Sequence, residues 1–118
     1  MKKSLISFML STFLIFPAFA DNVKIGIILG FTGPIESLAP VMAKSAEMAI
    51  DEVNKSGKFS AGKIDSVRGD STCVDAAAAQ AAAERLITAE KVNAIMGADC
   101  SGVTTAVLKN VEMPNGIV

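Results

Sequence analysis

The sequence contains no histidine, tryptophan or tyrosine, and only two cysteines. The absence of histidine removes the most common general base and the most common metal ligand. The net charge is −1 and the basic residues form no cluster, so the chain offers no electrostatic surface for nucleic acid or anionic lipid. This inventory excludes a hydrolase-type triad, and we expect a protein that is not an enzyme, with no catalytic residue, no metal and no cofactor.

The first segment of the chain has the features of a secretory leader. Lys2-Lys3 precedes an almost wholly apolar run from Leu5 to Phe16, and Ala18-Phe19-Ala20 offers a cleavage site of the A-x-A type. Pro17 ends the apolar run short of the roughly 20 residues that a membrane span needs. We therefore expect residues 1–20 to be a cleaved signal peptide and the mature protein to be periplasmic.

Strand and helix patterns alternate along the rest of the chain. Val23 to Gly30 is β-branched and almost continuously apolar, which is typical of a central parallel strand. A weaker strand is predicted around Ile64 to Arg68 and a third over Val92 to Met96, and Ile117-Val118 resembles the start of a fourth. This alternation predicts an α/β fold, a parallel sheet with helices on both faces, incomplete at its C-terminus.

Three helices are predicted between these strands. The first starts at a Ser37 cap and ends at Gly57, and the second starts at Asp75 and contains a long alanine tract. The third is capped by Ser101 and ended by Pro114. The inward faces are expected to hold Met42, Ala46, Ala49, Ile50 and Val53 in the first helix, Leu86 and Ile87 in the second, and Val103, Ala106, Val107 and Val111 in the third.

Three short motifs follow the predicted strands in order: Gly33-Pro34, Asp70-x-x-Cys73 and Gly97-x-x-Cys100-Ser101. Together they resemble the periplasmic substrate-binding proteins of branched-chain amino acid ABC transporters, the leucine/isoleucine/valine-binding type. The resemblance implies a two-lobed monomeric protein that captures an amino acid and delivers it to a membrane permease. Residues 21–118 would then be the first segment of the N-terminal ligand-binding lobe.

Ser101 is the strongest candidate for a ligand contact. Its hydroxyl group and the N–H groups at a helix start suit a carboxylate, and ligands of open α/β sheets bind outside the carboxyl ends of the strands. The alternative is that Ser101 only caps its helix. The resemblance implies that Ser101 helps to hold the α-carboxylate of an amino acid, that Asp99 and Cys100 lie at the pocket wall, and that Leu38 lies where an aromatic residue often touches the ligand.

Asp99 and Leu38 depart from the pattern of the leucine-binding members, in which the first position is apolar and the second is often aromatic. A carboxylate beside a pocket is costly unless it is paired or hydrated. Two interpretations stay open, since Asp99 could meet a polar or cationic group of the ligand or could face solvent. The identity of the amino acid is therefore left open.

Cys73 and Cys100 follow neighbouring predicted strands in a chain with an export signal. A disulfide between them is predicted, and it would brace the turn that carries Ser101. The alternative is a zinc site that adds Asp70, Asp75 or Asp99, but this site would have no histidine ligand.

Two further classes of function are considered. A nucleotide-dependent enzyme is disfavoured because the turn Gly30 to Pro34 lacks the G-x-G-x-x-G pattern and the chain has no Walker loop. A ligand-binding domain of a sensory or receptor protein shares the same fold and stays open as the alternative to transport.

Overall fold

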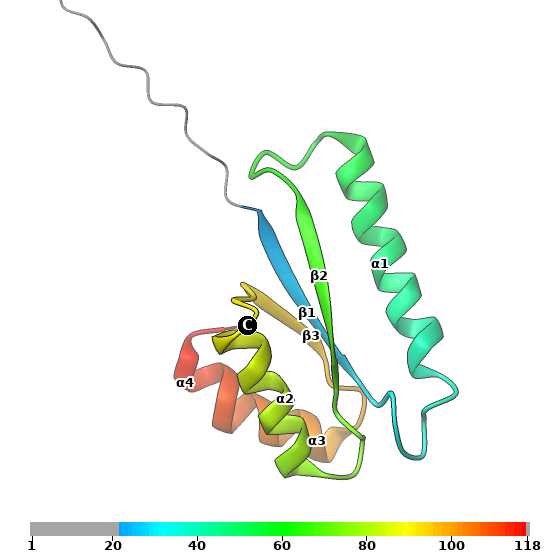
Figure 1. Ribbon diagram of the computed structural model, residues 1–118, viewed down its shortest axis with the longest axis vertical. Coiled ribbons are helices and arrows are strands. Elements are labelled where there is room, and N and C mark those ends of the chain that lie inside the picture. The colour runs from blue at the N-terminus through cyan, green and yellow to red at the C-terminus, as the bar shows by residue number, and fades with distance from the viewer. Residues whose placement is uncertain (1–21, 118) are drawn as a thin grey trace, which may run out of the picture.

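The computed structural model describes residues 22–117, so the expected signal peptide lies outside the described residues. Three parallel strands form one sheet in the order β2-β1-β3 (Figure 1). The strands are β1 (Val23–Leu29), β2 (Ile64–Asp70) and β3 (Ala94–Gly97). The helices are α1 (Ala39–Ser56), α2 (Ala76–Thr88) and α3 (Ser101–Val107), and α3 continues through a π-helix, η1 (Leu108–Glu112), into α4 (Met113–Asn115). The predicted α/β class with a parallel sheet is confirmed.

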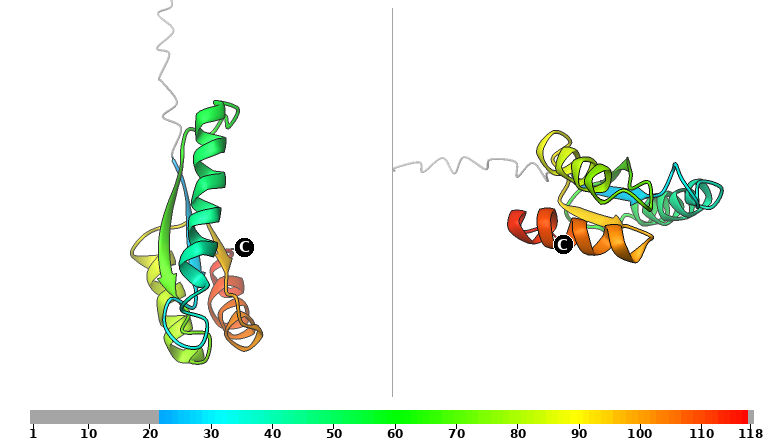
Figure 2. Two further views of the ribbon diagram at one scale, coloured as in Figure 1. Left: turned by 90° about the vertical axis from the view of Figure 1, so that its right-hand side faces the viewer. Right: turned by 90° about the horizontal axis from the view of Figure 1, so that it is seen from below.

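The central strand β1 is covered on both faces, as its apolar run predicts. Ile27 and Leu29 pack against α1, whereas Ile28 belongs to a second cluster with residues of α2 and α3. Successive side chains of a strand point to opposite faces, so β1 contributes to both clusters. Figure 2 shows α1 and α2 on opposite sides of the sheet.

The details of α1 differ from the prediction. Ser37 is not the cap, because the N-cap position falls on Leu38, which has no side-chain cap bond. The fully buried residues are Ala39 and Ala43, whereas Met42 is 43% exposed. Small alanine side chains let the helix lie close to the large side chains of β1, and this contact turns the predicted apolar face partly toward solvent.

The second helix follows the prediction. The Asp75 carboxylate accepts hydrogen bonds from the backbone N–H groups of Ala77 (2.9 Å) and Ala78 (3.0 Å) at the start of α2. Leu86 is fully buried, and a Cβ atom added at either Gly26 or Gly69 would lie 3.0 Å from its Cδ1. Glycines in two neighbouring strands therefore make room for this leucine.

The third helix begins and ends one residue away from the prediction. Ser101 is its first residue and Cys100 takes the N-cap position without a side-chain cap bond, so Ser101 is not the cap. The helix passes Pro114 and ends at Asn115, before Gly116 in the left-handed conformation. The wide π-helical turn precedes Pro114, where the ring would otherwise clash with the carbonyl four residues earlier. The predicted inward residues Val103, Val107 and Val111 are buried.

The predicted third strand is shorter than expected, and the predicted fourth strand does not form at Ile117. Val92 and Asn93 precede β3 rather than belonging to it. Ile117 lies in no strand, and Val118 lies outside the described residues. Between residues 22 and 117, no helix combines the length and the apolar character needed to cross a membrane.

Candidate functional site

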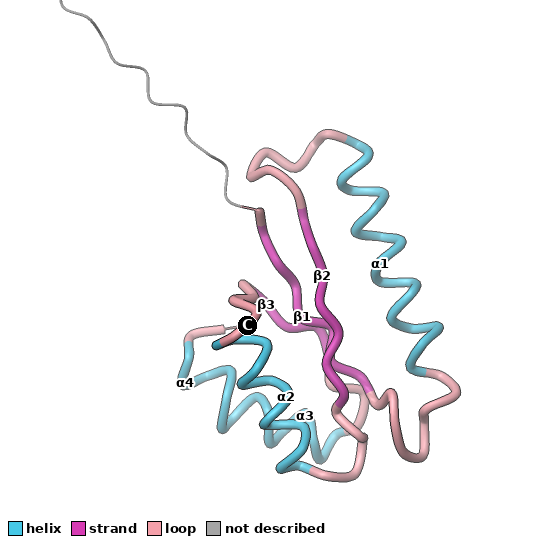
Figure 3. The backbone as a smooth tube through the Cα atoms, viewed as in Figure 1, coloured by secondary structure: helices cyan, strands magenta, loops and turns pink. Residues whose placement is uncertain are grey.

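Three turns meet at the carboxyl edge of the sheet, because each follows the end of a parallel strand (Figure 3). They are residues 30–38 after β1, residues 71–75 after β2 and residues 98–100 after β3. The N-termini of α1, α2 and α3 follow these turns, so the positive ends of their helix dipoles also lie at this edge. The predicted site residues Leu38, Asp99, Cys100 and Ser101 all belong to this edge.

A disulfide between Cys73 and Cys100 joins the turns after β2 and β3, as predicted. Their Cα atoms lie 5.2 Å apart, and the two cysteines are 27 positions apart in the sequence. Because each sulfur is bonded to the other, neither is available as a thiolate ligand, and the zinc alternative is wrong. Residues 22–117 contain no group of three side chains arranged to hold a metal ion.

The Asp99 carboxylate lies against the ends of the other two strands. Its Oδ2 accepts a hydrogen bond from the Gly30 backbone N–H (2.8 Å), and its Oδ1 accepts one from the Ser71 hydroxyl (3.2 Å). Gly30 and Ser71 are both buried residues, so these bonds satisfy donors that have little access to water. Asp99 is thus paired within the protein, a role that neither of the two sequence interpretations included.

Asp70 ties the turn after β1 to the turn after β2. Its carboxylate accepts hydrogen bonds from the Thr32 hydroxyl (2.6 Å) and from the backbone N–H groups of Thr32 (3.2 Å) and Thr72 (2.9 Å). Burial opposes ionisation, but the hydrogen bonds from Thr32 and Thr72 outweigh it and hold the pKa of Asp70 below its ordinary value. The carboxylate is therefore ionised at neutral pH.

Ser101 is exposed at the start of α3. The first backbone N–H that donates within the helix belongs to Thr104, which bonds the Cys100 carbonyl oxygen at 2.9 Å. The Thr104 hydroxyl donates to the Ala98 carbonyl oxygen at 2.6 Å, which holds the preceding turn against the helix. The turn therefore presents a hydroxyl group and first-turn N–H groups to solvent, an arrangement that suits a carboxylate.

Two motif glycines are required by close approaches at this edge. Gly33 has a φ of 91°, and a Cβ atom there would lie 2.5 Å from the Thr72 carbonyl oxygen. Gly97 has a φ of 130°, and a Cβ atom there would overlap the Ile28 carbonyl oxygen. The turns therefore pack backbone against backbone, which only glycine permits.

Leu38 stands at the N-cap of α1, and its side chain is 59% exposed. It places an apolar group at the same edge as Ser101. Sequence reasoning missed Ser71 and Thr104, which hold the edge together. Ser71 had no local signal, since its hydroxyl bonds a residue 28 positions away. Thr104 had one, because a threonine in a helix can donate its hydroxyl to the carbonyl four residues earlier, here that of Cys100.

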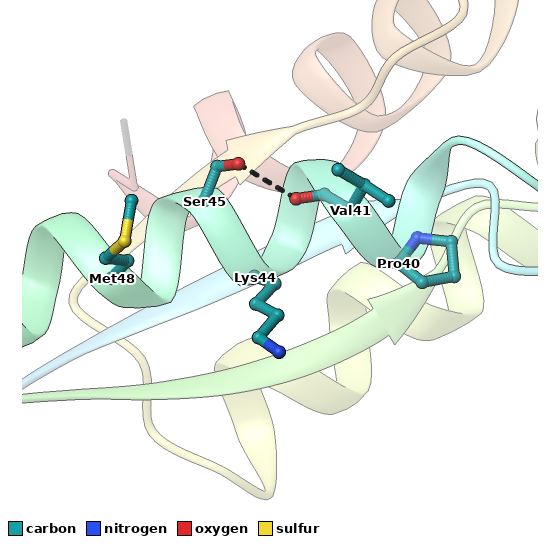
Figure 4. Close-up of a pocket in the computed structure, with 5 residues that line it drawn as sticks. All are labelled: Pro40, Val41, Lys44, Ser45 and Met48. Atoms are coloured by element: carbon teal, nitrogen blue, oxygen red, sulfur yellow. Dashed lines mark hydrogen bonds between the residues drawn. The ribbon is translucent and has the colours of Figure 1, made fainter.

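Two surface hollows lie along α1 rather than at the Ser101 turn. One, of about 360 Å³, is lined by Pro40, Val41, Lys44, Ser45 and Met48, where the Ser45 hydroxyl donates to the Val41 carbonyl oxygen (Figure 4). The other is lined by charged residues of the same helix and by Met48. Each is formed by a single helix and gathers no polar groups from separate elements, so neither resembles a ligand site.

This edge and this sheet define a class of protein, the open α/β lobe that binds a ligand outside the carboxyl ends of its strands. Residues 22–117 match the family described as periplasmic binding protein, and the chain belongs to that family. It is a family of substrate-binding proteins, not of enzymes. The predicted family resemblance is confirmed.

Two curated relatives are similar to the chain in sequence. The Leu/Ile/Val-binding protein homolog 7 of Brucella abortus is 40% identical over 90 residues, which are 76% of this chain and 22% of the relative. The Leu/Ile/Val/Thr-binding protein of Salmonella typhimurium is 29% identical over 74% of this chain and 23% of its own length. The chain thus spans less than a quarter of these relatives.

Solved structures agree with this family. The branched-chain amino acid transporter substrate-binding protein LivJ of Streptococcus pneumoniae, in complex with isoleucine, has a TM-score of 0.73 at 29% identity, over 82% of this chain and 27% of that one. The leucine-binding protein LivK of Thermotoga maritima has a TM-score of 0.65 at 28% identity, over 77% of this chain and 25% of that one.

Proposed function

We propose that this chain is the first segment of the N-terminal lobe of an exported solute-binding protein of an ABC transporter. The whole protein captures a branched-chain or related amino acid between two lobes in the periplasm and delivers it, as a monomer, to a membrane permease. The family, the isoleucine in the Streptococcus pneumoniae complex and the names of the curated relatives support this proposal. Closure of the lobes is a population shift driven by ligand contacts to both.

The observation that carries the proposal is the position of Ser101. Its hydroxyl group is exposed at the first residue of a helix, on a turn that a disulfide joins to the neighbouring strand end. In this proposal the hydroxyl and the N–H groups of the first turn bind the α-carboxylate. Asp99 and Cys100 form the wall of the pocket, and Leu38 lies near the ligand side chain.

A thermal-shift screen of the full-length protein against amino acids tests the proposal. Leucine, isoleucine or valine is expected to raise the melting temperature, since a ligand that binds only the folded state stabilises it. Ser101→Ala should weaken binding by about 1–3 kcal/mol, the cost of losing a buried polar partner. Ser60→Ala is the control, because Ser60 is exposed in the loop before β2 at the opposite edge.

Two results would contradict the proposal. An unchanged dissociation constant for Ser101→Ala in calorimetry would remove Ser101 from the site. The absence of any shift with amino acids, in a protein that is folded, would remove the ligand class.

A further inference from the structure

We propose that Asp99 positions the turn that carries Ser101 (residues 98–101, called the ligand turn below). The residue lies at the pocket wall, but its carboxylate acts through the backbone around Ser101 and makes no hydrogen bond or ion pair with the ligand. This inference rests on the proposed function and deepens it. It assigns to Asp99 a role that explains why a carboxylate stands where the leucine-binding pattern has an apolar residue.

The carboxylate joins three turns at one point. Asp99 belongs to the turn after β3, Gly30 ends the run of β1 and Ser71 follows β2. The two bonds run from separate donors to separate oxygens, Gly30 N to Oδ2 and Ser71 Oγ to Oδ1. Displacement of the ligand turn away from the sheet would therefore break both bonds together.

Burial makes these bonds costly to lose. Ser71 has no exposed surface, and Gly30 is a buried residue directly after the central strand. A buried donor without an acceptor loses its hydration without compensation, and a carboxylate is a stronger acceptor than a neutral group. An apolar side chain at position 99 would leave both donors unsatisfied.

Neither the disulfide nor the Thr104 hydroxyl connects the ligand turn to the end of β1. The disulfide from Cys100 reaches the turn after β2, and the Thr104 hydroxyl reaches back to Ala98 within the same turn. Of the side-chain hydrogen bonds described for residues 98–104, the Asp99 carboxylate supplies the one that reaches Gly30, directly after β1. The turn is thus held against the central strand before any ligand arrives, which reduces the ordering cost of binding.

The test separates the effect of the negative charge of Asp99 on amino acid binding from the effect of its hydrogen bonds. Asp99→Asn keeps an acceptor oxygen for the Gly30 N–H and an amide that can donate to Ser71, but it removes the negative charge. In the full-length protein, Asp99→Ala is expected to weaken amino acid binding at least 10-fold, whereas Asp99→Asn should stay within about 3-fold of the wild type. Ser71→Ala removes one of the two hydrogen bonds, and its dissociation constant should lie between those of Asp99→Asn and Asp99→Ala.

Asp75→Ala is the matched control, since it also removes an aspartate that accepts two hydrogen bonds at this edge, but from the N-terminus of α2. It should lower the melting temperature without changing the dissociation constant. If Asp99→Asn binds as poorly as Asp99→Ala, the charge itself meets the ligand and the proposal is overturned. Unchanged binding by Asp99→Ala would also overturn it.

Amide hydrogen exchange separates a failure of this inference from a failure of the proposed function. The Gly30 amide should exchange at least 10-fold faster in Asp99→Ala than in the wild type, with Asp99→Asn close to the wild type. This measurement needs no ligand, so it decides the positioning role even for a protein that binds no amino acid. An unchanged Gly30 exchange rate in Asp99→Ala would refute the role.

Discussion

The two edges of the sheet are held together by different side chains. At the carboxyl edge the ties come from the aspartates Asp70, Asp75 and Asp99 and from a disulfide. At the amino edge they come mainly from asparagines: Asn54 bonds both the N–H and the carbonyl of Ile64, and Asn93 accepts from the backbone N–H of Lys24. The Lys24 ammonium also donates to the Glu90 carbonyl oxygen there, and Asp65 accepts from Asn22.

The direction of the backbone explains this difference. Helix N-termini follow the strands at the carboxyl edge, so this edge has an excess of N–H donors and the positive ends of the helix dipoles, both of which favour carboxylates. The amino edge has helix C-termini and strand starts that offer donors and acceptors together. A neutral amide can both donate and accept, and asparagine therefore suits this edge.

The largest expected effect comes from removing the covalent tie. The paired substitution Cys73→Ala and Cys100→Ala should lower the free energy of unfolding by about 3–4 kcal/mol, since the disulfide closes a long loop in the unfolded chain. Urea denaturation measures the loss, with the wild type in a reducing agent as the control. A loss below about 1 kcal/mol would mean that hydrogen bonds alone hold the carboxyl edge.

Exchanging the side-chain type at the amino edge should have the next largest effect. Asn54→Asp keeps the acceptor for the Ile64 N–H, but it removes the donor to the Ile64 carbonyl and places a carboxylate against it. We expect a loss of about 1–3 kcal/mol at neutral pH, typical of a partly buried polar group left without its partner. Denaturation at neutral pH checks this value, and unchanged stability would contradict the contrast between the edges.

Acid should weaken the carboxyl edge through Asp70. The pKa of this carboxyl is lower in the folded protein than its ordinary value near 3.9. Its contribution to stability is therefore complete above that ordinary value and is lost as the pH falls through the folded pKa. This titration falls at about pH 5 to pH 3. Over that range the free energy of unfolding should decrease more for the wild type than for Asp70→Asn, by about 1 kcal/mol or less. Equal losses in the two proteins would remove Asp70 as the cause.

The smallest effect is expected for the reverse exchange at the carboxyl edge. Asparagine is about as good an N-cap as aspartate, so Asp75→Asn should change the free energy of unfolding by less than about 0.5 kcal/mol. Thermal denaturation measures the difference. A loss as large as that of Asn54→Asp would show that charge, rather than hydrogen-bond geometry, decides the cap.

Sequence reasoning succeeded where the signal was local. The apolar run of β1, the alanine tract of α2 and the Asp75 cap each depend on neighbours within a few residues, and the structure confirms all three. The disulfide was also predictable, because an exported chain with two cysteines offers a single internal pairing.

Sequence-based prediction failed where the environment of a residue depends on contacts with distant parts of the chain. The predicted inward face of α1 was right for Ala46 and Ile50, which pack against the core, but it missed Ala39 and Ala43, which are fully buried by contact with Ile27 and Leu29. The partner of Asp99 was missed because Gly30 lies 69 residues away. Likewise, the helix after β3 continues past Pro114, and no local pattern in the sequence predicted the π-helical turn that precedes this proline.

The sequence by itself determined the alternation of strands and helices and the family, because the hydrophobic period and the spacing of motifs are local properties of the sequence. Only the tertiary structure decided which side chains meet at the carboxyl edge. Parallel strands bring the ends of distant segments to one line, and the hydrogen bonds made there depend on distances that sequence separation does not contain.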